Sequence, residues 1–172
     1  MNSGSPARVA FSLAVAADAH AIAAMRTAAA DELARKFGAG HWASPSTEKA
    51  VLNSMRHSRI LIGRARSRVV ATARLATKKP WAIDVSYFTP CKRAIYLTDM
   101  AVDPAYQNRG VGRHCIDEAL ALVRAWPASA IRLDAYDARA GAGNFYAKCG
   151  FTERGRVAYR GTPLVYYEFV LS

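Results

Sequence analysis

The sequence predicts a mixed α/β fold in a single domain that spans residues 1–172. Its length suits one domain with a substantial core, and 52% of its residues are hydrophobic. Stretches with the period of a strand also alternate with stretches with the period of a helix. The predicted order of elements is β-α-α-β-β-β-α-β-α-β-β, without repeats or linkers.

The first half of the chain changes from helices to strands. Ile22, Met25, Ala29, Leu33 and Phe37 recur at helical spacing, Asp18 is a candidate cap before them, and Gly38 is a stop signal after them. Ser44-Pro45 predicts the start of a second, shorter helix. The predicted strands are Val9–Ala16, Arg59–Arg66 and Arg68–Thr77, the last two antiparallel about a turn near Ser67. Residues 78–93, which contain Pro80 and Pro90, are expected to be partly irregular.

In the second half, a strand that starts at Ala94 is stopped by Asp103-Pro104. An amphipathic helix follows the glycines at 110 and 112, and Pro127 ends it after Trp126. The remaining predicted elements are the strand Ala130–Tyr136, the helix Ala138–Lys148 and a strand pair over Phe151–Leu171 joined around Arg160-Gly161.

Composition restricts the class of partner. No apolar run approaches the roughly 20 residues that cross a bilayer, so no membrane partner is predicted. The run from Arg8 to Ala17 is interpreted as the first strand rather than a signal peptide, because a single Arg precedes it. The net charge of +11 favours partners rich in phosphate or carboxylate, such as CoA or nucleic acid, although no dense basic run supports nucleic acid.

The cysteines and histidines indicate neither disulfides nor a metal site. Cys91, Cys115 and Cys149 form no CxxC pair, and the four histidines show no compact ligand spacing. A reducing cytoplasm and an activity without a metal are therefore predicted.

The segment Gln107–Arg113 lies between a predicted strand and a strongly amphipathic helix. Glycines allow a close approach of the backbone to a diphosphate, and the free amides and the dipole of a helix N-terminus favour an anion. Arg109 and Arg113 add cationic donors. A Walker loop is absent, and a dinucleotide fingerprint would need a third glycine where Cys115 stands.

The residues around this loop carry a resemblance to a known family. The segment Tyr96–Gly112 reads Met-Ala-Val-Asp-Pro and then Gln-x-x-Gly-x-Gly, and it closely resembles the acyl-CoA site of the GNAT family of N-acetyltransferases. Asn144–Phe151 resembles the family's Tyr-x-x-x-Gly-Phe helix end. The resemblance implies a GNAT fold, with a central mixed sheet that splays open and is flanked by helices. It also implies direct transfer of the acetyl group from acetyl-CoA to an amine.

The resemblance further implies roles for individual residues. The backbone of Met100, Ala101 and Val102 is expected to pair with the pantetheine arm, and Tyr146 to contact the cofactor and protonate the leaving sulfur. The diphosphate is expected at Gln107, Asn108, Arg109, Gly110, Val111, Gly112 and Arg113. Arg139 departs from the family pattern, since members often have an Asn there that faces the cofactor.

The general base is less well defined. Some members of the family use a Glu on the strand before the glycine loop, in the region where Tyr96 and Thr98 stand here. Asp99 is the nearest carboxylate to that region and is the candidate catalytic base beside Tyr146. Strand alternation puts Asp99 on the side of Leu97, opposite Thr98 and Met100, unless a bulge resets the alternation. A purely structural carboxylate, or for Tyr146 a ring that only packs, remains the alternative interpretation.

The acceptor cannot be read from the sequence, and a small-molecule amine and a protein amine fit equally. Candidates for its recognition are His41, Trp42, Trp81, Asp84 and Tyr87, each of which can instead be a packing or surface residue. The alternative functions are a non-catalytic acyl-CoA-binding protein and a basic nucleic-acid-binding module. Acyl-chain preference and a homodimer are left open.

Overall fold

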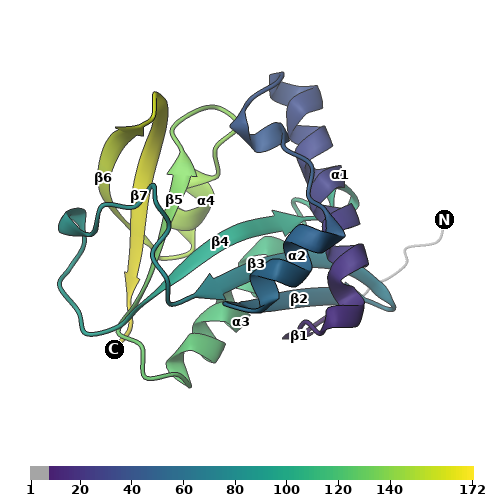
Figure 1. Ribbon diagram of the computed structural model, residues 1–172, viewed down its shortest axis with the longest axis horizontal. Coiled ribbons are helices and arrows are strands. Elements are labelled where there is room, and N and C mark those ends of the chain that lie inside the picture. The colour runs from purple at the N-terminus through teal and green to yellow at the C-terminus, as the bar shows by residue number, and fades with distance from the viewer. Residues whose placement is uncertain (1–7) are drawn as a thin grey trace.

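The computed structural model describes residues 8–172, so residues 1–7 of the predicted domain lie outside the described residues. Its centre is a seven-stranded sheet in the order β1-β2-β3-β4-β5-β7-β6 (Figure 1). Neighbouring strands are antiparallel except β4 and β5, which are parallel, so the predicted mixed sheet is confirmed. The strands are β1 Val9–Leu13, β2 Arg59–Ala65, β3 Arg68–Ala76, β4 Ala94–Val102, β5 Ala130–Tyr136, β6 Thr152–Tyr159 and β7 Thr162–Val170.

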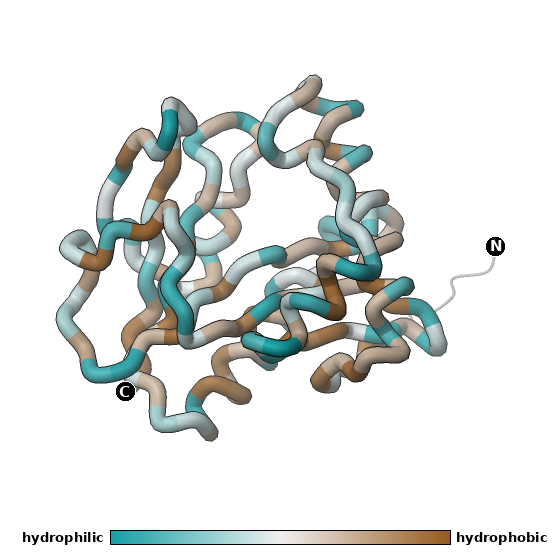
Figure 2. The backbone as a smooth tube through the Cα atoms, viewed as in Figure 1, coloured by the Kyte–Doolittle hydropathy of each residue, from teal (hydrophilic) through white to brown (hydrophobic). Residues whose placement is uncertain are grey.

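Helices cover both faces of the sheet (Figure 1). They are α1 Ala19–Phe37, α2 Glu48–Met55, α3 Val111–Arg124 and α4 Gly143–Lys148. On one face α1 and α2 bury Ile22 and Val51 against Ile62 of β2. On the other face α3 buries Ile116 against the sheet, in a cluster that includes Leu97 of β4. The hydrophobic segments of the tube in Figure 2 follow the strands and α3, whereas the connecting turns are mostly hydrophilic.

Two helices begin later than the sequence predicts. Residues 44–46 precede α2 without entering it, because the Oγ1 of Thr47 accepts a hydrogen bond from the amide of Ala50 at 3.2 Å and so caps the helix in place of Ser44. The predicted helix from Ala138 begins only at Gly143. Before it, the amide of Gly141 bonds the carbonyl of Ala138 at 2.8 Å and closes a turn.

Smaller differences between the predicted and the observed elements occur at the end of β1, the start of α1 and the end of α3. β1 stops at Leu13, and Ala16–Asp18 forms a short 3-10 turn. The carboxylate of Asp18 accepts a hydrogen bond from the amide of Val15 and pairs with Arg64. It makes no cap hydrogen bond to α1, so the prediction that Asp18 caps this helix is wrong. α3 ends at Arg124, since the amide of Trp126 bonds the carbonyl of Val123 in a tighter turn.

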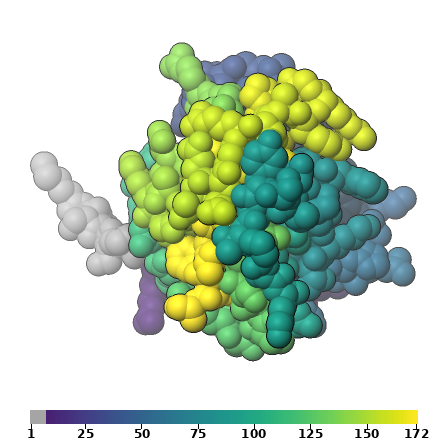
Figure 3. Space-filling model, turned by 90° about the vertical axis from the view of Figure 1, so that its left-hand side faces the viewer, coloured from purple at the N-terminus to yellow at the C-terminus, as the bar shows by residue number. Residues whose placement is uncertain are grey.

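The excursion between β3 and β4 is irregular as predicted, apart from a 3-10 turn at Val85–Tyr87. Ile83 and Phe88 of this segment pack on Tyr96 of β4 and Tyr166 of β7 in a small core of their own. Figure 3 shows the excursion lying against the C-terminal strands. Within residues 8–172, no helix combines the length and the hydropathy that a bilayer crossing requires.

Candidate active site

The sheet opens where β4 and β5 separate. Their parallel pairing runs from Ala94 with Ala130 to Tyr96 with Arg132, although both strands continue beyond it. Past Tyr96 the edge of β4 that faces β5 therefore has no strand partner within the described residues. Met100, Ala101 and Val102, the residues predicted to meet the pantetheine arm, all lie in this separated part of β4.

A β-bulge in β4 changes the direction of the side chains at this opening. Thr98 pairs with Arg74 of β3 and Ala101 pairs with Thr72, so Asp99 and Met100 together oppose a single residue of β3. Asp99 has a left-handed backbone, with φ of 51°. The bulge resets the alternation that simple strand geometry gives.

The side chains of the two bulge residues consequently point to opposite faces of the sheet. Met100 packs into the core on the side of α3. The carboxylate of Asp99 instead accepts a hydrogen bond from Nη1 of Arg74 at 3.1 Å. Arg74 is adjacent to Ala73 and Leu75, which both point into the core on the α3 side, so Arg74 and with it Asp99 face α1.

The glycine loop forms an anion-binding geometry at the start of α3. Asn108 and Gly110 have φ of 58° and 77°, so left-handed residues alternate with ordinary ones and aim successive amides in one direction. The helix has no side-chain cap at Gly110, and the amide of His114 makes the first helical bond, to the carbonyl of Gly110. The amides of Val111, Gly112 and Arg113 precede that bond and are available to an anion.

The side chains of the loop behave differently from one another. Gln107 donates from Nε2 to the carbonyl of Val102 at 3.0 Å, which ties the loop to the end of β4. Arg113 donates to the carbonyl of Lys148 at 2.8 Å and pairs with Asp117, so it joins α3 to α4 instead of extending into the loop. Arg109 is exposed, and Val111 is buried in the core, so Val111 offers only its backbone.

Tyr146 of α4 lies beside the bulge. Its hydroxyl donates to the Sδ of Met100 at 3.7 Å, and its ring is fixed by contacts with the rings of Phe145, Phe151 and Tyr167. The side chain is 7% exposed. Burial raises the pKa of Tyr146 well above its usual range, and the neighbouring Cys115 and Asp134 raise it further.

Asp134 of β5 is a carboxylate that sequence reasoning missed. It follows Arg132 on the same face of β5, just beyond the last pair that β5 makes with β4. Burial raises the pKa of Asp134, and its charge acts on Tyr146 and Tyr136. The available signal was its alternation with Arg132 in a strand that is otherwise apolar at its centre.

The residues predicted for acceptor recognition do not gather in one place. Trp42 stacks edge-on against Tyr136 at 5.6 Å between ring centroids, and so connects the segment after α1 to the end of β5. Trp81 is 84% exposed. Asp84 caps the 3-10 turn through Ser86, and Tyr87 packs on Tyr166, so both belong to the excursion.

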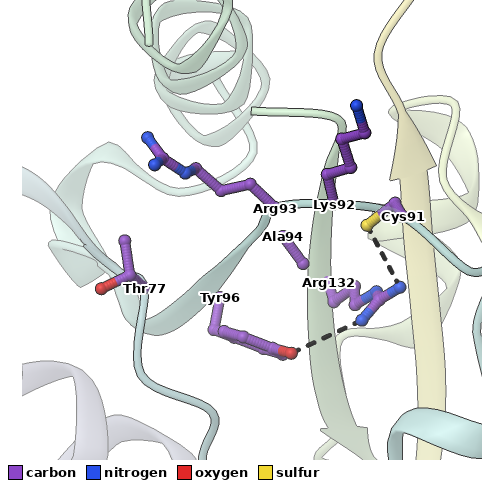
Figure 4. A pocket seen from close by; sticks show the side chains of 7 residues that line it. All are labelled: Thr77, Cys91, Lys92, Arg93, Ala94, Tyr96 and Arg132. Carbon is purple, nitrogen blue, oxygen red and sulfur yellow. Dashed lines mark hydrogen bonds between the residues drawn. The ribbon is translucent and has the colours of Figure 1, made fainter. Parts of the chain in front are cut away.

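A recess of about 500 Å³ lies where β4 and β5 begin, at the end of these strands away from the opening. It is lined by Thr77, Cys91, Lys92, Arg93, Ala94, Tyr96 and Arg132. Figure 4 shows Tyr96 and Cys91 turned toward Arg132, whereas Lys92 and Arg93 extend away from it. Arg132 also bonds Glu168 at 3.1 Å and the carbonyl of Thr89 at 2.6 Å. Its donors are thus used to anchor the excursion to β5 and β7, which makes this recess a structural junction.

No cluster of three or more His, Cys, Asp or Glu residues suited to a metal ion occurs in residues 8–172. Cys91 is exposed, Cys115 and Cys149 are buried, and all three thiols are free.

Comparison with solved structures identifies the class of this fold. An N-acetyltransferase from Staphylococcus aureus Mu50 is similar over 96% of this chain and 99% of its own, with a TM-score of 0.71 and 16% identity. A putative acetyltransferase, yncA, from Salmonella typhimurium, solved with its cofactor acetyl-CoA, covers 95% and 94%, with a TM-score of 0.69 and 17% identity. The paia N-acetyltransferase from Thermoplasma acidophilum in complex with coenzyme A covers 95% and 99%, with a TM-score of 0.72 and 13% identity.

The sequence comparison gives the family. A model described as the Acetyltransferase (GNAT) family matches residues 22–151, and the chain belongs to that family. The GNAT fold implied by the motifs at Tyr96–Gly112 and Asn144–Phe151 is therefore confirmed. Among curated proteins, no sequence relative is detected.

Proposed function

We propose that this protein transfers the acetyl group of acetyl-CoA directly to an amine. The observation that carries the proposal is the contact of the Tyr146 hydroxyl with a sulfur atom, that of Met100, at the place where β4 separates from β5. A phenol held beside a sulfur acceptor, next to a loop with free helix amides, suits a thioester that carries a diphosphate. Family membership and the acetyl-CoA and CoA complexes among the structural neighbours support the same donor.

The residues present fit acetyl-CoA as a co-substrate. Amides from Asn108 to Arg113 would hold the diphosphate, with Gln107 fixing the loop and Arg109 adding an exposed charge. The backbone of Met100, Ala101 and Val102 would pair with the pantetheine arm along the free edge of β4. When bound, the co-substrate supplies an acetyl group activated as a thioester.

Three side chains and one stretch of backbone would do the chemistry. Amides of the separated part of β4 stabilise the negative charge that develops on the acetyl oxygen, since fixed donors need little reorganisation. Tyr146 donates a proton to the departing sulfur. Burial raises the proton affinity of both partners in this transfer, so the raised pKa of Tyr146 is compatible with the role.

Asp99 and Asp134 would receive the acceptor. Asp99, fixed by Arg74 on the α1 face, is proposed to hold the amine beside the thioester as a catalytic residue. Asp134 is proposed to take its proton, because burial raises the pKa of this carboxylate and so increases its affinity for a proton. No metal takes part in this scheme.

We further propose that one domain spans the chain and that it acts in the cytoplasm, where its three free thiols stay reduced. Several of the arginines that contribute to the net charge form ion pairs, namely Arg64 with Asp18, Arg68 with Asp103 and Arg156 with Asp137. Paired arginines offer less free charge to phosphates, which favours the enzyme over a nucleic-acid-binding module.

The test is release of free thiol from acetyl-CoA across a panel of small amines, amino acids and peptides. We expect turnover with at least one class of acceptor, at a rate that depends on the amine concentration. Binding of acetyl-CoA without turnover on any amine would favour the non-catalytic acyl-CoA-binding alternative. Binding of nucleic acid that weakens with salt, without turnover, would favour the basic module.

A further inference from the structure

Two arginines with incomplete hydrogen bonding lie on the α1 face of the opening. Arg26 of α1 reaches over the sheet, and its Nη2 donates to Oγ1 of Thr72 at 3.4 Å. Arg74 of β3 lies opposite Thr98 of β4 in the strand register and pairs with Asp99 at 3.1 Å. These side chains come from three elements and face the same side of β4 as Asp99.

This cluster has more positive than negative charge, and some of its buried polar atoms have no hydrogen-bond partner within the described residues. The carboxylate of Asp99 pairs with Arg74, and Arg26 has no ion pair of its own within the described residues, so one carboxylate faces two guanidinium groups. The Nε of Arg26, the Nε of Arg74 and the Oγ1 of Thr98 are buried, and none has a hydrogen-bond partner in the part of the chain that the structure describes. Burial lowers the pKa of Arg26, and the like charge of Arg74 lowers it further against the opposing effect of Asp99.

Unpaired buried donors are costly, so native structures contain few of them without a reason. Arg132 of β5, whose side chain is buried, shows the usual outcome, since Glu168, Tyr96 and Thr89 all accept from it. Arg26 and Arg74 keep spare donors although both are partly exposed. An anion that arrives from solvent can therefore reach the exposed part of each guanidinium group, next to the buried Nε atoms that have no partner.

The cluster also lies next to the reacting atoms. Asp99 is adjacent in sequence to Met100, whose sulfur is in contact with the hydroxyl of Tyr146. The bulge sends Met100 to the α3 side and Asp99 to the α1 side, so the cluster faces the side on which Asp99 is proposed to hold the amine. A group bound by Arg26 and Arg74 would therefore be a few bonds away from an amine held at Asp99.

Resting on the proposed function, we propose that the acceptor is an amine that carries a carboxylate close to it, that is, a free amino acid. The planar guanidinium groups of Arg26 and Arg74 bind the carboxylate through charge-assisted pairs, and the hydroxyl of Thr98 donates to it. Asp99 binds the ammonium group. A zwitterion thus matches the alternation of charges from Arg26 to Asp99.

Other acceptors fit the cluster less well. A polycationic amine would bring positive charge against two arginines that have one carboxylate between them. The amine at the N-terminus of a protein has a peptide bond where an amino acid has its carboxylate, so the donors of Arg26 and Arg74 would stay unused. Both classes are outcomes that the experiment can detect.

The experiment compares matched acceptors with the wild-type protein and acetyl-CoA. For alanine, leucine, phenylalanine, methionine and glutamate, kcat/KM for thiol release is measured for the amino acid, its amide and its decarboxylated amine. We expect the free acid of at least one series to exceed its amide and its amine by roughly 10- to 100-fold, the range for a charge-assisted pair. Aminophosphonic analogues report whether the site accepts other anions.

Substitutions then assign the preference to residues. Arg26→Met and Arg74→Met should each reduce the preference for the acid over the amide by roughly tenfold or more while acetyl-CoA binding is unchanged. Arg35→Met is the matched control, because Arg35 lies on α1 and pairs at the surface with Glu32. It should leave the preference intact.

The outcomes distinguish the failure of this inference from the failure of the proposed acetyl transfer on which it rests. Equal use of acids, amides and decarboxylated amines by the wild-type protein would overturn the carboxylate site and leave acetyl transfer standing. Equal loss for all three acceptors in Arg26→Met and Arg74→Met would also overturn it. Absence of thiol release with every amine, from folded protein that binds acetyl-CoA, would instead remove the proposed function itself.

Discussion

The hydroxyl of Tyr146 lies 3.7 Å from the Sδ of Met100, so the C-terminal half of α4 touches β4 at its bulge. This contact joins two motifs that are far apart in the sequence, the strand before the glycine loop and the helix before Gly150. The ring of Tyr146 is held by three aromatic neighbours, whereas its hydroxyl has a single weak sulfur acceptor. The hydroxyl is therefore free to change partner when a thioester arrives.

Tyr146→Phe keeps the packed ring and removes the donor. We expect turnover to fall by roughly ten- to a thousandfold, because the departing sulfur loses its proton source, while affinity for acetyl-CoA changes little. Burial raises the pKa of Tyr146, so the proton stays in place throughout the neutral range and this group should add no alkaline limb to the pH profile below pH ~10. Steady-state kinetics and calorimetry measure the two effects.

Tyr167→Phe is the matched control for that substitution, since Tyr167 packs on Tyr146 at 6.1 Å between ring centroids and its loss of a hydroxyl should leave turnover near normal. Tyr146→Ala should impair both packing and turnover. Full activity in Tyr146→Phe would remove Tyr146 from the mechanism.

Acetyl-CoA should raise the thermal midpoint, because a ligand that binds only the folded state stabilises it. At a hundred times Kd the gain is about 2.7 kcal/mol, or roughly 5–10 °C for a chain of this size. Gly112→Glu should abolish this shift by placing bulk and negative charge beside the free amides of α3. Differential scanning calorimetry with and without the ligand measures it.

The structure adds a control to this experiment. A Cβ at Gly112 would lie 3.2 Å from the ring of Phe145, so any side chain there also strains the contact between α3 and α4. Gly112→Ala introduces that contact without the charge, and it should retain most of the shift that acetyl-CoA causes. A Gly112→Glu protein that folds and shows the normal shift would show that the loop does not hold the diphosphate.

The order of elements could be predicted from the sequence because it depends on local periodicity and on Gly and Pro signals. The glycine loop was indicated by its glycines and the amphipathic helix after it, whereas the aromatic end of α4 was indicated only by its resemblance to a family motif. The predicted start of α2 is wrong because Thr47 and Ser44-Pro45 both carry cap signals, and the structure uses the cap hydrogen bond from the amide of Ala50 to Thr47.

The acceptor half of the site could not be predicted. The side on which Asp99 lies depends on its bulge, which exists only once β4 pairs with β3. Asp134 becomes a candidate only because β5 leaves β4 just before it, and Arg26 is brought to Arg74 by the docking of α1. These relationships arise from contacts between distant segments, for which a single sequence carries no local signal.

Glu168 should be important for stability. It is 2% exposed and pairs with Arg132 at 3.1 Å and Arg154 at 3.5 Å, and its Oε2 accepts from the amide of Thr89. Glu168→Gln leaves two arginines without their counter-charge, so we expect a loss of about 3–5 kcal/mol in the free energy of unfolding, or roughly 6–20 °C in the midpoint. Urea denaturation measures the loss.

The matched control is Glu153→Gln. Glu153 forms an ion pair with Arg156 at 2.8 Å on the surface, where such pairs contribute about 0–1 kcal/mol. Equal effects of the two substitutions would contradict the role of Glu168 as the anchor of the excursion between β3 and β4.

The final prediction concerns Asp134, whose pKa is raised by burial. A carboxyl with a folded pKa above its unfolded value of ~3.9 binds more protons in the folded state, so its contribution to stability is present below that value and is lost as the pH rises through the folded pKa. Asp134→Asn should therefore stabilise the protein at neutral pH, and the difference should vanish at acidic pH.

Activity should respond to Asp134→Asn in the opposite sense, because an amide cannot accept the proton of the amine. We expect kcat/KM to fall by roughly ten- to a thousandfold at neutral pH and the acid limb of its pH profile to disappear. Asp99→Asn should instead raise KM for the amine and keep the acid limb, since Asp99 is proposed to hold the acceptor. Measured pH profiles of the two variants decide the assignment, and an acid limb that persists in Asp134→Asn but is lost in Asp99→Asn would transfer the role of base to Asp99.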